Sequence, residues 1–75
     1  MQFIEMSGKT LFRLVKGSGP DPEDLAGVGV EDESIVRVNR QGDIELRRAD
    51  RWDVIGGLLG DFEQRIKKGT GLDWA

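Results

Sequence analysis

The chain has 75 residues, a formal net charge of −3, and neither cysteine nor histidine. This length allows one domain at most, and the missing residue types exclude disulfide bonds and the usual zinc and haem ligand sets. The mild negative charge disfavours a nucleic acid or an anionic membrane surface as the partner.

We expect no signal peptide, because residues 2–5 carry no basic side chain and no long apolar run follows them. The longest run of apolar residues and glycine, residues 54–60, is far shorter than the ~20 residues that span a bilayer. We therefore expect a cytoplasmic protein without a membrane partner, folded as one domain over residues 1–75. Residues 69–75 either pack back on the domain or form a flexible tail.

The first predicted element is a β-hairpin. Residues 2–6 and 10–15 are rich in strand-forming types, and Ser-Gly-Lys at residues 7–9 has turn chemistry. Turns of two and of three residues both fit, so the register stays open. The sequence SGKT at residues 7–10 is not a phosphate-binding loop, because that motif needs a glycine at the position of Phe3 and a helix after the loop.

Glycine and proline interrupt the pattern over residues 16–33 and indicate a connecting segment. A short helical turn is predicted at residues 20–27, where Asp21 can cap and Pro22 fits the first helical position. Residues 21–33 hold acids and no base, but their spacing does not fit a calcium-binding loop, so we expect a solvated acidic segment and no metal.

A second hairpin is predicted from strict alternation over residues 34–39 and 43–48. A three-residue loop that ends at Gly42 places Arg37 opposite Glu45, whereas a two-residue loop would set an apolar residue against a charge. The three-residue loop also requires a left-handed residue, which Gly42 supplies. One face of this hairpin is then wholly apolar: Val36, Val38, Ile44 and Leu46.

A C-terminal helix is predicted over about residues 51–68, with Asp50 as its N-cap and Gly69 as its C-cap. Its apolar stripe, with Leu59 and Phe62 expected among the most buried residues, is Trp52, Ile55, Leu58, Leu59, Phe62 and Ile66. Gly56 and Gly60 lie only ~40° apart on the flank of this stripe, where they permit close approach of another backbone, from this chain or from a partner.

These elements predict an α+β fold: two β-hairpins form a roughly four-stranded antiparallel sheet, and the C-terminal helix covers one face. The other face then exposes a mixture of apolar and charged side chains, which suits a non-enzymatic protein-interaction module or a homodimer. No cofactor and no catalytic set are expected, because histidine and cysteine are missing. The residues expected at the interaction surface are Phe3, Leu11, Ile35, Gly56, Gly60 and Trp74.

The alternative function is nucleic-acid binding by arginines around the second hairpin, which could contact phosphates. We favour a solvated sheet face instead, because acidic residues dilute the positive charge and the predicted helix leaves Trp52 unavailable for stacking on bases. The arginines concerned are Arg37, Arg40, Arg47, Arg48 and Arg51.

Overall fold

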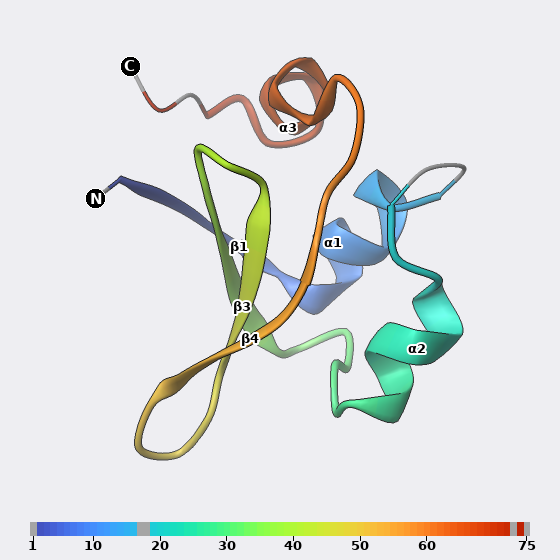
Figure 1. The fold of residues 1–75 in the computed structure, drawn as a ribbon, viewed down its shortest axis with the longest axis vertical. Coiled ribbons are helices and arrows are strands. Elements are labelled where there is room, and N and C mark those ends of the chain that lie inside the picture. Colours follow the sequence, from blue (N-terminus) through green and yellow to red (C-terminus); the bar gives the residue numbers. More distant parts are fainter. Residues whose placement is uncertain (1, 17–18, 73, 75) are drawn as a thin grey trace.

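A computed structural model describes residues 2–16, 19–72 and 74 of the chain (Figure 1). Four antiparallel strands form one sheet in the order β1-β2-β3-β4, and helices α1 and α2 lie between β1 and β2 in the sequence. The α+β class and the four-stranded antiparallel sheet with a C-terminal helix are confirmed. In chain order the elements are β1 (Phe3–Ser7), α1 (Gly8–Leu14), α2 (Pro22–Gly27), β2 (Ile35–Asn39), β3 (Asp43–Arg47), β4 (Trp52–Gly57) and α3 (Phe62–Thr70).

The prediction of a first hairpin was wrong, because residues 10–14 belong to α1 rather than to a strand. Ser7 caps this helix, and its hydroxyl oxygen accepts a hydrogen bond from the backbone N–H of Thr10 at 3.2 Å. Leu11, Leu14 and Val15 follow at helical spacing and are buried. Strand β1 pairs instead with β2, with Glu5 opposite Arg37.

The short helix in the connection is confirmed as α2. The side chain of Asp21 accepts a hydrogen bond from the N–H of Glu23 at 2.9 Å, and Pro22 occupies the first turn. Leu25 is 1% exposed, so this helix contributes to the core through one residue.

The second hairpin has the predicted register. Arg37 lies opposite Glu45, and Gly42 has a φ of 89°, in the left-handed region that glycine favours. The side-chain oxygen of Asn39 accepts hydrogen bonds from the N–H groups of Gln41 and Asp43, which holds the loop.

The predicted helix over residues 51–68 was wrong in its first half. Residues 52–57 form β4, which pairs with β3 through an irregular register, and Asp50 lies in the turn between them. The helix α3 begins only at Phe62 and ends before Gly71, whose φ is 75°. Leu59, expected in the core, is 66% exposed in the connection from β4 to α3.

The core lies between the sheet and its helices. In Figure 1, α1 and α2 lie on one side of the sheet and α3 lies beside the β2–β3 turn. Trp74 packs edge-on against Phe62, with ring centroids 6.1 Å apart, and its indole N–H donates to the carbonyl of Val38 at 3.2 Å. The core comprises Ile4, Met6, Leu11, Leu14, Val15, Leu25, Val30, Val36, Val38, Ile44, Leu46, Leu58, Ile66 and Trp74. No helix in the described part of the chain is long and apolar enough to cross a membrane.

Candidate interaction surface

The sheet has one face without a covering helix, which we call the open face. Alternate strand residues point into the core, so the residues between them point to the opposite side. Its central row crosses all four strands: Glu5 pairs with Arg37, Arg37 with Glu45, and Glu45 with Val54. The open face consists of Phe3, Glu5, Ile35, Arg37, Glu45, Arg47, Trp52 and Val54.

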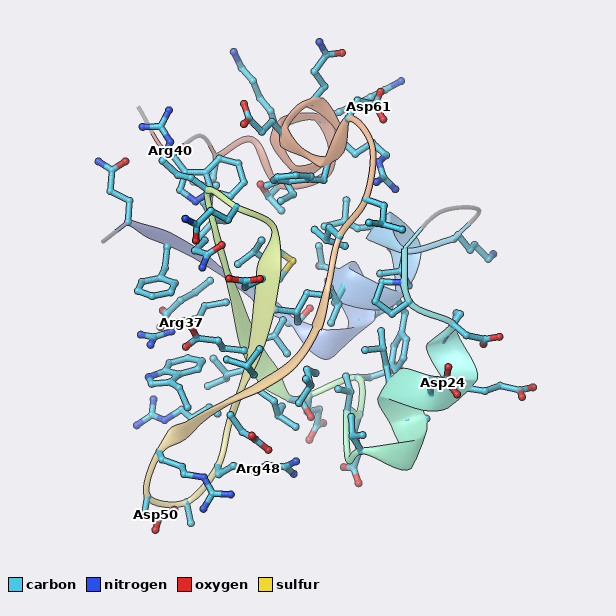
Figure 2. The ribbon with its side chains drawn as sticks, in the orientation of Figure 1. Asp24, Arg37, Arg40, Arg48, Asp50 and Asp61 are labelled. Atoms are coloured by element: carbon cyan, nitrogen blue, oxygen red, sulfur yellow. The ribbon has the colours of Figure 1, made fainter. Side chains whose placement is uncertain are left out.

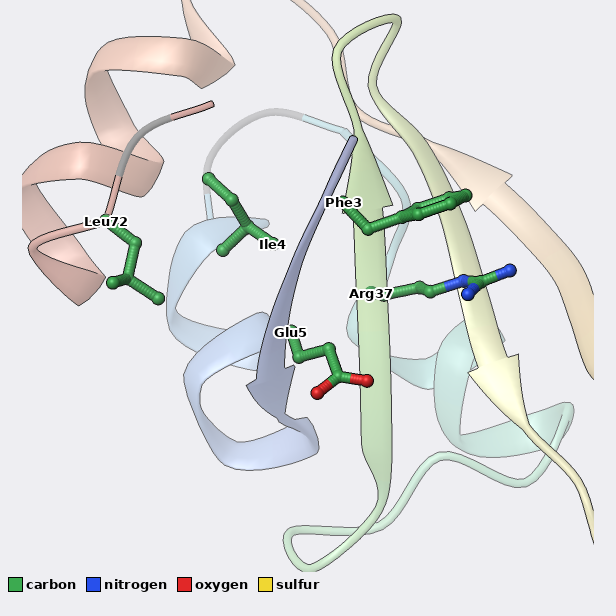
Figure 3. Close-up of a pocket in the computed structure, with 5 residues that line it drawn as sticks. All are labelled: Phe3, Ile4, Glu5, Arg37 and Leu72. Atoms are coloured by element: carbon green, nitrogen blue, oxygen red, sulfur yellow. The ribbon is translucent and has the colours of Figure 1, made fainter. Parts of the chain in front are cut away.

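Arg37 is the centre of the open face. Its guanidinium carbon lies 3.7 Å from the ring centroid of Phe3 and 4.1 Å from that of Trp52, so one cation stacks between two aromatic rings. Figure 3 shows Phe3 and Arg37 extending side by side, with Ile4 on the other side of β1. Each such contact contributes ~0.5–1 kcal/mol at an exposed site.

Glu45 fixes the orientation of this cation. Arg37 Nε donates to Glu45 Oε1 at 2.8 Å, and Arg37 Nη2 lies 2.7 Å from the same oxygen. The two side chains are 23% and 13% exposed, so solvent screens their attraction less than it screens a fully exposed pair. The charge of Arg37 is therefore satisfied within the domain, and its rigid side chain holds both rings in place.

Apolar side chains flank the Arg37 cluster. Ile35 is 44% exposed and Val54 is 63% exposed, one on each side of β3. A surface hollow beside the cluster is lined by Phe3, Ile4, Glu5, Arg37 and Leu72 (Figure 3). Rigid aromatic and arginine side chains beside apolar ones are the composition found at the centres of protein interfaces.

Two residues predicted at the interaction surface, Phe3 and Ile35, do lie on the open face. Two others were wrong, because Leu11 is 0% exposed and Trp74 is 4% exposed. Leu11 points into the core from α1, which sequence analysis had interpreted as a strand, and Trp74 closes the core beside Phe62.

The proposed glycine flank of a helix does not exist. Gly56 lies in β4, and a Cβ atom there would stand 3.4 Å from Pro20 Cγ, an ordinary contact. Gly60 lies in the turn before α3 with a φ of 73°, and a Cβ atom there would meet nothing within 4 Å. Gly60 supplies a left-handed turn and Gly56 lies in a strand, so neither glycine occupies a helix interior.

Four of the five arginines of the alternative function line one hollow with Trp52, together with the acidic residues Glu5 and Asp50, and Arg40 lies apart from them. Arg40 and Arg48 belong to the turns at opposite ends of β3, and Figure 2 shows them far apart. Arg37 and Arg47 lie on the open face, where Arg37 is already paired.

The remaining arginines hold the β3–β4 turn. Arg48 donates to Asp53 Oδ2 at 3.0 Å and to the carbonyl of Val28 at 3.0 Å, which ties this turn to the end of α2. Arg51 lies 4.0 Å from the carboxylate of Asp50, and both side chains are exposed.

Of the two sequence arguments against a phosphate-binding loop, the missing glycine at Phe3 stands and the missing helix was wrong. Strand β1 does lead into a helix at Gly8, contrary to expectation. However, the N–H groups of Gly8 and Lys9 donate to the carbonyls of Ser34 and Asp32, at 2.8 and 3.1 Å. A Cβ atom at Gly8 would also collide with the carbonyl of Glu31, so the loop before β2 fills this site.

Sequence reasoning did not place Trp52 and Val54 on the open face, where they are two of the four nonpolar residues, beside Phe3 and Ile35. The signal was present in residues 52–55, Trp-Asp-Val-Ile, where aromatic and β-branched types are typical of strands. Among residues 2–16, 19–72 and 74, no cluster of three or more carboxylates could hold a metal ion.

Comparisons with known proteins give one partial similarity. The chain is 35% identical over 60 residues to the orotidine 5'-phosphate decarboxylase of Deinococcus radiodurans. The aligned segment covers 80% of this chain but only 22% of that protein. No family model matches the chain, and no solved structure matches it. The alignment covers only about a fifth of that enzyme, so the function of this chain is inferred from its own surface.

Proposed function

We propose that this domain is a non-enzymatic protein-interaction module that binds its partner through the open face. The observation that carries this proposal is the stacking of Arg37 between Phe3 and Trp52, with Glu45 holding the guanidinium. A preformed cluster of this kind loses little side-chain entropy on binding, which favours affinity.

The charges of the open face favour a protein over a nucleic acid. Glu5 and Glu45 balance Arg37 and Arg47, so the face has no net positive charge to attract a phosphate backbone. Exposed Ile35 and Val54 add apolar area that a protein partner would cover. The partner can be a second copy of the chain, and the cytoplasmic location expected from the sequence stays a prediction.

The test compares two matched substitutions. Val54→Lys places a charge on the open face, and Leu59→Lys places the same charge on an exposed apolar residue before α3. Sedimentation equilibrium measures whether two copies of the chain associate. Affinity capture on the immobilised chain isolates a different protein partner, which is then purified so that its binding to each variant can be measured. We expect Val54→Lys to abolish the association and Leu59→Lys to preserve it. Equal loss, or no association of either kind, would contradict the proposal.

Nucleic-acid binding is the second candidate, because Trp52 lies on the open face rather than inside a helix. It shares a hollow with Arg47, Arg48 and Arg51, which supplies the aromatic platform that single-stranded nucleic acids use. Fluorescence anisotropy with a labelled single-stranded oligonucleotide tests this function. Affinity that falls steeply between about 50 and about 200 mM salt, and that Trp52→Ala weakens, would favour it over a protein partner.

A catalytic role follows only from the name of the Deinococcus protein. Its name states that it decarboxylates orotidine 5'-phosphate, so the direct experiment incubates this chain with that compound and measures carbon dioxide release. We expect no release above the rate in buffer, since the chain aligns with only 22% of that enzyme. Release that depends on the chain would contradict the non-enzymatic proposal.

A further inference from the structure

A second charged surface lies on the helix side of the sheet, away from the open face. The C-terminal end of α1 and one side of α3 form a groove between them, which we call the basic groove. It is lined by Arg13, Leu14, Lys16, Arg65, Lys68 and Gly69. Four of these six residues are cationic and none is acidic, in a chain whose net charge is −3.

The groove is a fixed feature of the helix packing. Arg65 donates through Nη1 to the carbonyl of Leu14 at 2.7 Å and through Nη2 to the carbonyl of Leu59, so α3 is tied to the end of α1. A Cβ atom at Gly69 would stand 3.1 Å from Leu14 Cδ2, which shows how closely the helices approach at the floor. Leu14 and the aliphatic stems of the long side chains give that floor an apolar character.

The cations of the groove differ in how their charge is balanced. Asp61 Oδ1 lies 3.5 Å from Arg65 Nε, and the two groups form an ion pair without a hydrogen bond. Arg13, Lys16 and Lys68 are exposed, and no carboxylate of the described residues lies within ion-pair distance of them. Like charges gathered on one surface raise its free energy, and an acidic ligand lowers it again.

We propose that the basic groove binds an acidic segment of a partner protein. The cations of the groove lie on α3 and at the C-terminal end of α1, on either side of an apolar floor. A complementary segment therefore carries carboxylates along both of its edges and apolar side chains between them. A small inorganic anion would meet the cations but leave the floor exposed. An amphipathic peptide rich in Glu and Leu satisfies both features.

The test measures binding of a fluorescein-labelled synthetic peptide, in which Glu and Leu recur at helical spacing, to the whole chain. A second peptide with Gln in place of every Glu controls for apolar contact. The protein variant combines Arg13→Gln with Lys68→Gln, and the matched control combines Arg40→Gln with Arg51→Gln, which removes the same charge from the turns of the sheet. Circular dichroism verifies that each variant folds.

We expect the groove variant to weaken binding of the acidic peptide about tenfold and the control variant less than about twofold. Val54→Lys on the open face should leave peptide binding unchanged. The proposal for the open face and the proposal for the basic groove are therefore tested independently. The proposal is overturned if the acidic peptide does not bind, if both double variants weaken it equally, or if the Gln peptide binds as tightly. Displacement of the peptide by inorganic phosphate or single-stranded RNA at lower concentration would also overturn it.

Discussion

The open face and the basic groove are both charged surfaces, yet they differ in how their most prominent cations are partnered. On the open face Arg37 has a carboxylate and two aromatic rings within contact distance. In the groove Arg13 and Lys68 have no carboxylate of the described residues within ion-pair distance. Paired charges stabilise a surface and fix its shape, whereas unpaired charges raise its free energy and remain available to a ligand.

This difference separates stability from binding in the two regions. Substitutions on the open face should lower the free energy of unfolding and damage binding together, because the same contacts serve both. Substitutions of the unpaired groove cations, Arg13 and Lys68, should damage binding alone. Thermal and urea unfolding of single variants therefore test whether the two regions differ in this way.

The largest effect is expected where α3, which forms one wall of the groove, is anchored in the core. Ile66 is 0% exposed, so Ile66→Ala should lower the free energy of unfolding by ~2–5 kcal/mol through lost burial and a cavity. Urea unfolding followed by tryptophan fluorescence measures this, since Trp74 packs beside Phe62 of the same helix. A change below ~1 kcal/mol would mean that α3 does not hold the groove in place.

The second effect concerns the centre of the open face. Arg37→Leu removes two cation–π contacts and leaves the carboxylate of Glu45 without its partner, which should lower the free energy of unfolding by ~2–3 kcal/mol. A double-mutant cycle with Glu45→Gln should yield a coupling energy of ~1 kcal/mol. Independent effects of the two substitutions would show that the pair contributes nothing and that the open face resembles the groove.

The extent to which sequence predicted these surfaces depends on how far apart their residues lie in the chain. The Arg37–Glu45 pair was predictable because alternation and one loop length place both residues within a single hairpin. Phe3 and Trp52 join this pair only through β1 and β4, whose pairing is set by tertiary contacts.

Two local patterns were ambiguous. Residues 52–62 fit a helical stripe and also contain strand-forming types, and pairing with β3 decided in favour of the strand. Residues 10–15 are rich in strand formers, but the cap at Ser7 and the spacing of Leu11 and Leu14 select a helix. The basic groove could not be inferred locally, because it joins residues about 50 positions apart, as in the bond from Arg65 to Leu14.

A smaller effect should distinguish Arg65 from the other groove cations. Arg65→Leu leaves the carbonyls of Leu14 and Leu59 without their donor, so the free energy of unfolding should fall by ~1–2 kcal/mol. Arg65→Lys should recover little of this, because an ammonium cannot span both carbonyls as the planar guanidinium does. Thermal melts of the two variants provide the measurement, and a full rescue by Lys would show that the two carbonyl hydrogen bonds of the guanidinium contribute nothing to stability.

The smallest effect, and the one that separates the two surfaces most directly, is expected at Arg13 and Lys68. Neither side chain has an acidic partner among the described residues, so Arg13→Gln and Lys68→Gln remove mutual repulsion without breaking an ion pair. Each should change the free energy of unfolding by no more than ~0.5 kcal/mol, because the relief of repulsion is offset by the loss of a cation from the last turn of a helix. Added salt screens the same repulsion, so it should stabilise the wild type slightly more than the double variant. Urea unfolding at low and high ionic strength measures both effects. A loss of ~1 kcal/mol or more at either residue would show that these cations are paired as Arg37 is, and the contrast between the open face and the basic groove would not hold.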